Sequence, residues 1–233
     1  MQQFFIDDIS KPKLSKQQIH QVKTVLKMRV GDTVRLVDFN GAGVIVSFVS
    51  PDFKVFNIIE PIEFKKKNTK LKIVASLIRS ERLEWMIQKA AEAGVDEIVL
   101  YSADKGVVKD YGEKIDRKIS RFNLIALEAS EQSYRQVPLK VRGVIGKYDI
   151  EKEKGDINLF ADTQKYKHYL DEITLNKDIS VIVGPEGGFS DHERETFTKF
   201  GFKPVSLGAN IYRAETAPVA IAVLTTSIDR EII

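Results

Sequence analysis

The chain has 233 residues, of which 43% are hydrophobic and 30% charged, and its formal net charge is +3. This length and composition are typical of a soluble globular protein with one or two domains. Cysteine is absent and histidine occurs three times. Disulfides, thiolate metal sites and Cys nucleophiles are therefore excluded, and we expect no metal. No apolar run approaches the roughly 18 residues of a membrane span, and the acidic start is unlike a signal peptide, which predicts a cytoplasmic protein without membrane association.

The charge is unevenly distributed. Residues 1–70 carry 12 Lys and Arg against 7 Asp and Glu, whereas residues 71–233 carry 24 against 26. A basic N-terminal third is compatible with a polyanionic partner and equally with a well-solvated small domain.

The first third is predicted to consist mostly of short strands. Residues 2–6 are extended, and residues 15–28 form a helix that opens with a Ser15/Gln18 capping box and places Ile19, Val22, Val25 and Leu26 on one face. Residues 30–50 contain a turn signal, FNGAG, between two apolar runs, which predicts a hairpin, and residues 53–60 form a further strand. This pattern favours a small β-barrel over residues 1–68, followed by a basic linker.

From residue 71 the pattern changes to strands that alternate with helices. Strands are expected at 71–78, 95–101, 157–162, 178–184 and 203–208, and helices at 80–93, 113–131, 163–173, 190–201 and 213–232. The helix at 80–93 should bury Leu83, Met86, Ile87, Ala90 and Ala91 and end at Gly94. Such alternation predicts a parallel α/β sheet in a second domain over residues 71–233, with ligands at the carboxyl ends of the strands.

Three of these strands end in distinctive loops: LFADTQ, VIVGPEGGFS and SLGANIYRAETAP. In the middle loop, three glycines permit close backbone approach to a ligand, and Ser190 with Glu193 forms a capping box for the next helix. No phosphate-binding glycine motif is present, and Glu186 would repel phosphates. A ligand with hydroxyls and an amine, such as S-adenosylmethionine, suits this loop better, although a tight structural turn explains it equally well.

Five segments together resemble one family. IHQVKTVLKMRVGDTVRLVDFNG, LIRSERLEWMIQKAAEAGVDEI, EASEQSYR, VIVGPEGGFSDHE and SLGANIYRAETAPVAI are similar, in this order, to motifs of the RsmE family of bacterial 16S ribosomal RNA uridine N3-methyltransferases. The resemblance implies an N-terminal PUA-like β-barrel for RNA and a C-terminal SPOUT domain, an α/β fold with a trefoil-knotted parallel sheet and flanking helices. It also implies a homodimer that uses S-adenosylmethionine and acts on 16S ribosomal RNA, within the small ribosomal subunit.

The resemblance assigns cofactor-binding residues to all three loops. They are Phe160, Ala161, Val183, Gly184, Pro185, Glu186, Gly187, Gly188, Leu207, Gly208, Ile211, Tyr212, Arg213, Ala214, Thr216 and Ala217. The chain departs from the family pattern elsewhere, with Gln3 and Asn210 where arginine is usual, Lys27 for arginine and Tyr134 for glycine. These departures affect the expected RNA contacts and leave the cofactor loops intact.

Methylation of uracil N3 requires loss of the N3 proton, so a general base would help. The candidates are Glu128, Glu131 and Glu215, with Arg213 as a stabiliser of the developing anion. The candidate phosphate contacts are Lys27, Arg29, Arg79, Arg82 and Arg135. The sequence leaves open which of these acids is the general base and which nucleotide is methylated.

Two other classes of function remain compatible with the sequence. A non-catalytic RNA-binding protein would lack cofactor affinity, which the intact glycine loop argues against. A nucleotide-binding enzyme with an ordinary doubly wound sheet would bind ATP or NAD, which the missing phosphate motifs argue against.

Overall fold

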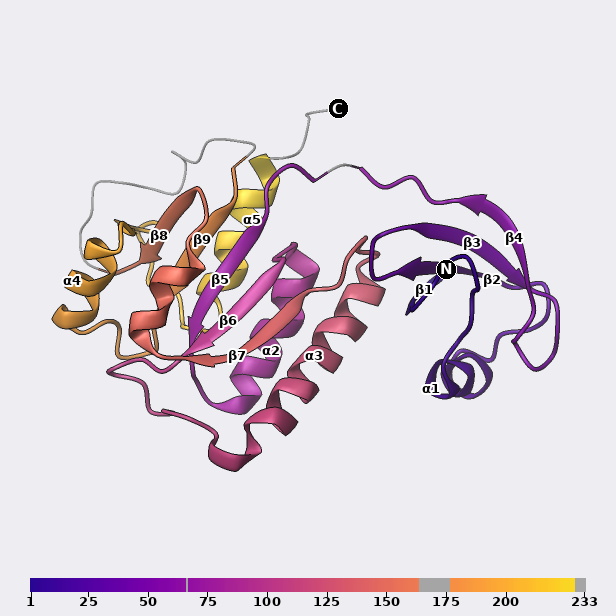
Figure 1. The fold of residues 1–233 in the computed structure, drawn as a ribbon, viewed down its shortest axis with the longest axis horizontal. Helices are drawn as coiled ribbons and strands as arrows, with labels where there is room; N and C mark the ends of the chain where they lie inside the picture. Colours follow the sequence, from indigo (N-terminus) through magenta and orange to yellow (C-terminus); the bar gives the residue numbers. More distant parts are fainter. Residues whose placement is uncertain (66, 164–176, 229–233) are drawn as a thin grey trace. The chain divides into compact units, whose positions relative to one another are not determined.

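The computed structural model describes residues 1–65, 67–163 and 177–228, and its chain divides into two compact units. The first unit comprises Met1–Lys66 together with Ser130–Pro138, and the second comprises Lys67–Ala129 together with Leu139–Ile233. Figure 1 shows the order of the elements along the chain.

The first unit is built on a four-stranded sheet in the order β1-β2-β3-β4. The strands are β1 (Gln2–Ile6), β2 (Thr33–Asp38), β3 (Gly43–Phe48) and β4 (Phe56–Pro61). β1 pairs with β2 in parallel, and β2, β3 and β4 pair in antiparallel fashion, so the predicted hairpin is confirmed. Phe4, Val34, Leu36, Val46 and Phe48 form the centre of its apolar core.

The helical segment of this unit differs from the prediction in its second half. The Ser15/Gln18 capping box is present and starts α1 (Lys16–His20). A π-helical turn, Gln21–Val25, follows, in which the Leu26 amide donates to the Gln21 carbonyl. Because a π-turn has more residues per turn than an α-helix, it rotates the following side chains away from the core. Val25 and Leu26, which were expected on one helix face with Ile19 and Val22, are therefore 67% and 37% exposed, whereas Val22 is buried.

Residues Ser130–Pro138 belong to the first unit although they are distant from it in sequence. The Glu131 carboxylate accepts a hydrogen bond of 2.9 Å from the Phe5 amide, and the Gln3 side chain donates to the Arg135 carbonyl at 2.8 Å. This segment includes SEQSYR of the family segment EASEQSYR, which thus packs on β1.

The second unit contains a six-stranded, fully parallel sheet in the order β10-β8-β9-β5-β6-β7. Its strands are β5 (Leu71–Ser76), β6 (Glu97–Tyr101), β7 (Lys140–Ile145), β8 (Ile157–Ala161), β9 (Ile179–Val183) and β10 (Lys203–Val205). The predicted parallel α/β architecture is confirmed. β7 was not predicted, because this edge strand alternates Lys140 and Arg142 with apolar residues and has no continuous apolar run.

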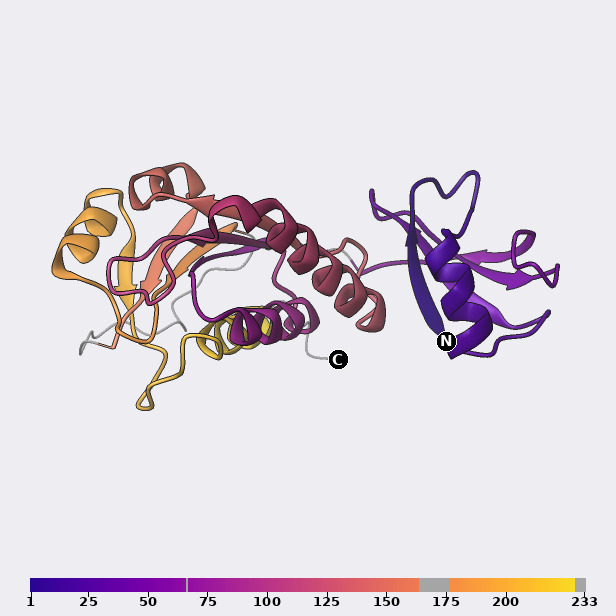
Figure 2. The same cartoon turned by 90° about the horizontal axis from the view of Figure 1, so that it is seen from below.

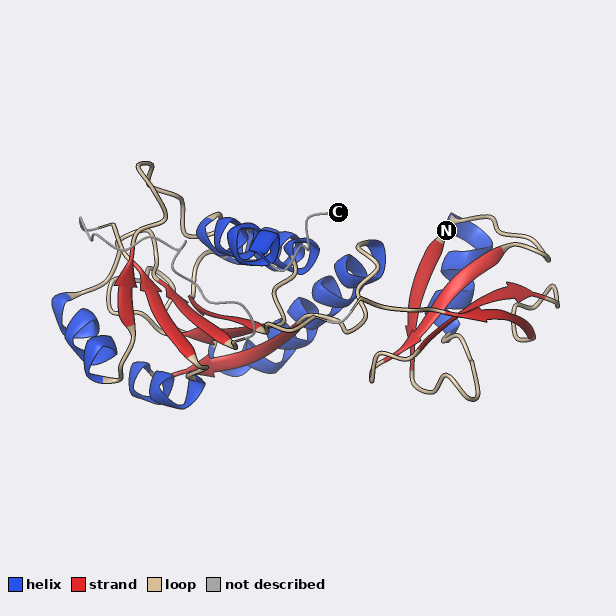
Figure 3. Ribbon diagram, turned by 90° about the horizontal axis from the view of Figure 1, so that it is seen from above, coloured by secondary structure: helices blue, strands red, loops and turns tan. Residues whose placement is uncertain are grey.

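Helices cover both faces of this sheet. α2 (Ser80–Ala93), α3 (Ile115–Gln132) and α5 (Ala217–Ile228) contribute to one apolar core, and α4 (Asp191–Lys199) and the 3-10 segment Lys147–Glu153 contribute to the other. Figure 3 shows α4 and α5 on opposite sides of the strands, and Figure 2 shows α2 and α5 side by side.

The helices of this unit agree with the prediction in α2 and differ from it at the start of α5. α2 buries the five residues expected and ends at Gly94, whose φ is 97°. α5 begins at Ala217 instead of Arg213, because the amides of Thr216 and Ala217 both donate to the Arg213 carbonyl in a preceding turn. The helix expected at 163–173 lies almost wholly outside the described residues. Within the described ranges, no helix is long and apolar enough to cross a membrane.

Candidate functional site

A cavity of about 860 Å³ lies at the carboxyl ends of β8, β9 and β10. This is the edge at which parallel α/β sheets bind ligands, and the volume is in the range of small-molecule sites. The loops after these strands supply most of its lining: Ala161, Asp162, Thr163, Val183, Gly184, Pro185, Glu186, Gly187, Gly188, Phe189, Ser206, Leu207, Gly208, Ala209, Asn210, Ile211, Tyr212, Arg213 and Ala214, with Arg194 of α4 and Ala217 of α5.

The loop after β9 is held in shape by its glycines. The Gly188 amide donates to the Pro185 carbonyl at 2.9 Å, and Gly188 has φ of 66°, a conformation that favours glycine. A Cβ on Gly184 would lie 2.9 Å from the Phe189 ring, which is buried against Phe160 and Phe197. The loop backbone therefore packs directly against the Phe189 ring because Gly184 lacks a side chain.

The predicted capping box at Ser190 is present and does more than start α4. The Ser190 hydroxyl accepts from the Glu193 amide, and one Glu193 oxygen accepts from the Ser190 amide. The other Glu193 oxygen accepts from the Asp104 amide at 2.9 Å, and Glu193 is fully buried. Hydrogen bonds from Lys147 and Ser190 lower the pKa of Asp104. The buried glutamate thus fastens the cavity loop to the loop after β6.

Glu186, the acid of the glycine loop, is paired with α2. Its carboxylate lies 2.9 Å from Nη1 of Arg82, and Nε of the same arginine lies 3.9 Å from Oε1 of Glu215. Arg82 therefore joins the loops after β9 and β10. Oε2 of Glu215 is buried and has no hydrogen-bond partner among the described residues.

A second ion pair in the cavity was not predicted from the sequence. Nε of Arg194 lies 2.6 Å from Oδ2 of Asp162, whose side chain is 1% exposed, and this hydrogen bond raises the pKa of Arg194. Both residues line the cavity. The signal was Asp162 itself, a carboxylate directly after strand β8, but its partner is 32 residues away and only the fold brings the two together.

The three candidate general bases have different surroundings in the structure. Glu128 is exposed on α3. Glu131 is 7% exposed and accepts from the Phe5 amide in the first unit. Glu215 is 8% exposed and lies between the cavity-lining residues Ala214 and Ala217, although it does not line the cavity itself. Arg213, the candidate anion stabiliser, is an exposed residue of the cavity lining.

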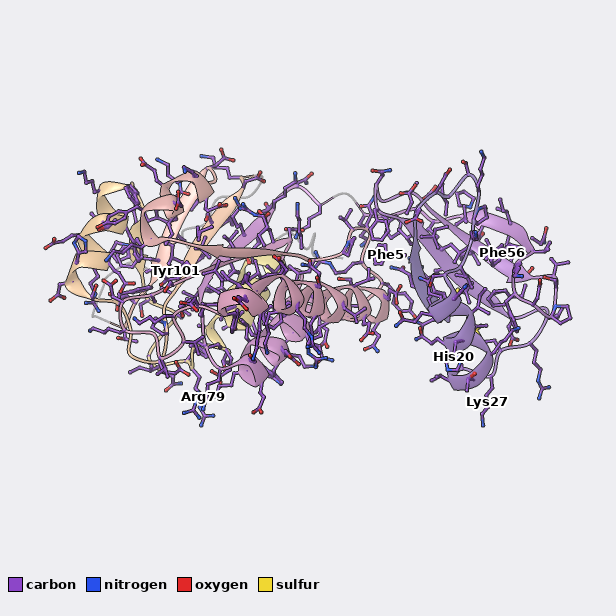
Figure 4. The ribbon with its side chains drawn as sticks, turned by 60° about the horizontal axis from the view of Figure 1, so that its bottom comes forward. Phe5, His20, Lys27, Phe56, Arg79 and Tyr101 are labelled. Atoms are coloured by element: carbon purple, nitrogen blue, oxygen red, sulfur yellow. The ribbon has the colours of Figure 1, made fainter. Side chains whose placement is uncertain are left out.

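The candidate RNA contacts fall into two groups. Lys27, Arg29 and Arg79 are exposed, and Figure 4 shows the labelled side chains of Lys27 and Arg79 reaching away from the ribbon. Arg82 and Arg135 are partly buried and have partners within the chain, Arg82 in its ion pairs and Arg135 through Nε on the Val137 carbonyl at 3.1 Å.

Of the residues predicted to bind the cofactor, all but two line the cavity. Phe160 is 1% exposed and packs beneath it against Phe189, and Thr216 lies in the turn before α5. Sequence reasoning missed Asp162, Thr163, Phe189, Arg194, Ser206, Ala209 and Asn210 as lining residues. Among the residues that the structure describes, no cluster of three or more His, Cys, Asp or Glu side chains is arranged to hold a metal ion.

The second unit combines a parallel α/β sheet with a ligand-sized cavity between three of its loops, and residues 65–226 match the RNA methyltransferase domain family. The chain is 32% identical to the ribosomal RNA small subunit methyltransferase E of Rickettsia conorii, over 88% of this chain and 84% of the relative. The chain belongs to the ribosomal RNA small subunit methyltransferase E family.

Two solved structures share the fold over nearly the whole chain. A putative methyltransferase from Legionella pneumophila, in complex with bound S-adenosylmethionine, has a TM-score of 0.85 and 27% identity, with 97% of each chain covered. The ribosomal RNA small subunit methyltransferase E of Neisseria gonorrhoeae, bound to S-adenosylmethionine, has a TM-score of 0.88 and 22% identity, with 98% of each chain covered.

Proposed function

We propose that this protein transfers a methyl group from S-adenosylmethionine to N3 of a specific uridine in 16S ribosomal RNA, within the small ribosomal subunit. The observation that carries the proposal is the cavity at the ends of β8, β9 and β10, whose walls are the three loops that carry the family motifs. The L. pneumophila relative, which contains bound S-adenosylmethionine, supports the choice of cofactor.

The residues of the cavity suit this cofactor. Gly188 and Gly208 line the cavity, and a Cβ on either would meet no protein atom within 4 Å, so these positions leave room for a ligand beside the backbone. Backbone amides and carbonyls of the three loops would hold the adenosine part. Among the described residues that line the cavity, no cluster of unpaired positive charge favours a polyphosphate. When bound, S-adenosylmethionine supplies an electrophilic methyl group.

The protein's own contribution is to orient the uracil and to remove its N3 proton. Positioning a nucleophile in line with the methyl group lowers the barrier without a metal. Of the three acids, Glu215 is the best-supported general base, because it lies between the cavity-lining residues Ala214 and Ala217 and its Oε2 has no partner among the described residues. Its Oε1 lies 3.9 Å from Arg82, whereas Glu131 accepts a hydrogen bond from a backbone amide. Arg213, exposed at the cavity, would stabilise the negative charge that develops on the uracil oxygens.

The finer features of the fold belong to the same proposal. We infer a PUA-like RNA-binding barrel in residues 1–68 and a SPOUT domain in residues 71–233. α5 packs against α2 and β5, so the chain returns from the β10 edge to the middle of the sheet, the crossing that a trefoil knot would require. Trp85 of α2 and Val223 and Leu224 of α5 are 43–54% exposed apolar residues, which supports burial in a homodimer. The proposed substrate places the enzyme in the cytoplasm.

The test is methylation with labelled S-adenosylmethionine, using naked 16S ribosomal RNA and small subunits in parallel, followed by mapping of the modified base. A methyl group on N3 of one uridine is expected, and methyl on another base or on no RNA would contradict the proposal.

Arg213→Ala should retain S-adenosylhomocysteine binding by calorimetry and lose most methylation. Glu215→Gln should also retain cofactor binding and should lose most methylation, because the amide cannot accept the N3 proton. Binding of ATP or NAD in place of S-adenosylhomocysteine would favour a nucleotide-binding enzyme.

A further inference from the structure

Tyr134, in the segment EASEQSYR, has an unusual backbone conformation. Its φ is 55°, in the left-handed region. Glycine adopts this conformation freely, but it is costly for a bulky residue and persists only where the surrounding structure compensates. The tyrosine side chain therefore stands on a backbone conformation that disfavours it.

The side chain is nevertheless firmly held. The Tyr134 hydroxyl donates to the Met1 carbonyl. The guanidinium of Arg35 lies 5.1 Å from the centre of the Tyr134 ring, and the Phe64 ring lies 5.7 Å from the same guanidinium. Nε of Arg35 donates to Gln3 at 3.1 Å. The guanidinium of Arg35 thus contacts two aromatic rings, that of Phe64 and that of Tyr134.

This stack does not bury the tyrosine. Tyr134 is 44% exposed, so its ring contributes little to the apolar core of the first unit. Arg35 has no carboxylate partner among the residues that the structure describes, and its charge is therefore not neutralised by an ion pair. An exposed, fixed aromatic ring backed by an unneutralised cation has the chemistry that single-stranded RNA requires, because bases stack on aromatic rings and phosphates are attracted to arginine.

We propose that Tyr134 is a stacking platform for an unpaired base of the RNA substrate, with Arg35 holding the ring and adding positive charge. The inference rests on the proposed function, since it assigns a residue to the binding of the same RNA. Tyr134 binds RNA by its ring and takes no part in methyl transfer. Gln3 supports the platform by accepting the hydrogen bond from Nε of Arg35, which orients the guanidinium.

The test measures the affinity of the full chain for 16S ribosomal RNA by filter binding over a range of salt concentrations. Tyr134→Leu should weaken binding about 5- to 150-fold, the range for loss of one stacked base. The slope of log K against log salt should not change, because no phosphate contact is lost. Tyr134→Phe and Tyr134→Trp should keep wild-type affinity. Arg35→Gln should reduce the slope by about one.

Two variants separate binding from folding. Tyr134→Gly relieves the positive φ, so its thermal midpoint should not fall below that of the wild type, while its RNA affinity should weaken as much as that of Tyr134→Leu. Tyr148→Leu is the matched control, since Tyr148 is 62% exposed in the second unit and its loss should not affect binding. S-adenosylhomocysteine binding should be equal in all variants.

The inference is overturned if Tyr134→Leu or Tyr134→Gly binds 16S ribosomal RNA as the wild type does, or if the Tyr148 control loses the same affinity. A wild-type protein that binds S-adenosylhomocysteine but neither binds nor methylates 16S ribosomal RNA would instead refute the proposed function.

Discussion

Gly184→Ala is expected to damage both the stability of the second unit and its cavity. A Cβ at this position would lie 2.9 Å from Cε1 of Phe189 and 3.2 Å from Cδ1 and Cζ. Phe189 cannot easily retreat, because it is 1% exposed and packs edge-on against Phe160 at 5.7 Å and Phe197 at 5.5 Å. To reach an ordinary contact of 3.4 Å, the loop and the ring must separate by about 0.5 Å.

Overpacking of this kind costs about 1–3 kcal/mol. For a unit of this size each kcal/mol lowers the melting temperature by about 2–4 °C, so a fall of about 2–12 °C is expected. The displaced loop forms one wall of the cavity, so the affinity for S-adenosylhomocysteine should fall as well. Differential scanning calorimetry and isothermal titration calorimetry measure the two effects on the same preparation.

Two further variants make the reasoning specific. Gly143→Ala is the matched control, because a Cβ there meets nothing within 4 Å and its φ is not positive; it should melt and bind as the wild type does. In the double variant Gly184→Ala/Phe189→Leu the ring is gone, so the added methyl should cost less than it does alone. A Gly184→Ala protein with unchanged melting temperature and affinity would refute the argument from close approach.

The remaining predictions concern two acids outside the cavity. Glu131→Ala leaves the buried Phe5 amide without its acceptor and should lower stability by about 1–3 kcal/mol in denaturant titration. Glu131→Gln keeps an acceptor oxygen, so it should retain stability and methylation, and loss of methylation alone would reinstate Glu131 as the base. Hydrogen bonds from Lys147 and Ser190 lower the pKa of Asp104, so its ionised form stabilises the fold above the unfolded pKa of about 3.9, and this contribution is lost as pH falls through the folded pKa. Asp104→Asn should therefore be less stable than the wild type near pH 7, with a difference that disappears in acid; a constant difference would exclude the ionised carboxylate as its source.

Residue spacing predicted correctly the features whose residues lie within a few positions of one another. The five inward residues of α2 and the capping boxes at Ser15 and Ser190 could be read directly from spacing. Prediction was poorer where the backbone departs from a regular α-helix. The π-turn after α1 has no spacing signature and exposes Val25 and Leu26.

The candidate site shows the same division. The three loops were identifiable because their residues are contiguous in sequence, and the parallel order of the strands predicts that such loops meet. Arg194 was missed because its role depends on Asp162, which lies on another element. Arg82 was assigned to RNA from its charge alone, but in the structure it pairs with Glu186.

The alternation of strands and helices, the cavity loops and the family could all be identified from the amino-acid sequence. These features depend on interactions between residues close in the chain, or on motifs of contiguous residues. The pairing of charges, the place of Ser130–Pro138 in the first unit and the contact between Tyr134 and Arg35 became visible only in the folded chain. The physical reason is that ion pairs, close backbone approaches and stacked rings join residues far apart in sequence, and no local periodicity records such a contact.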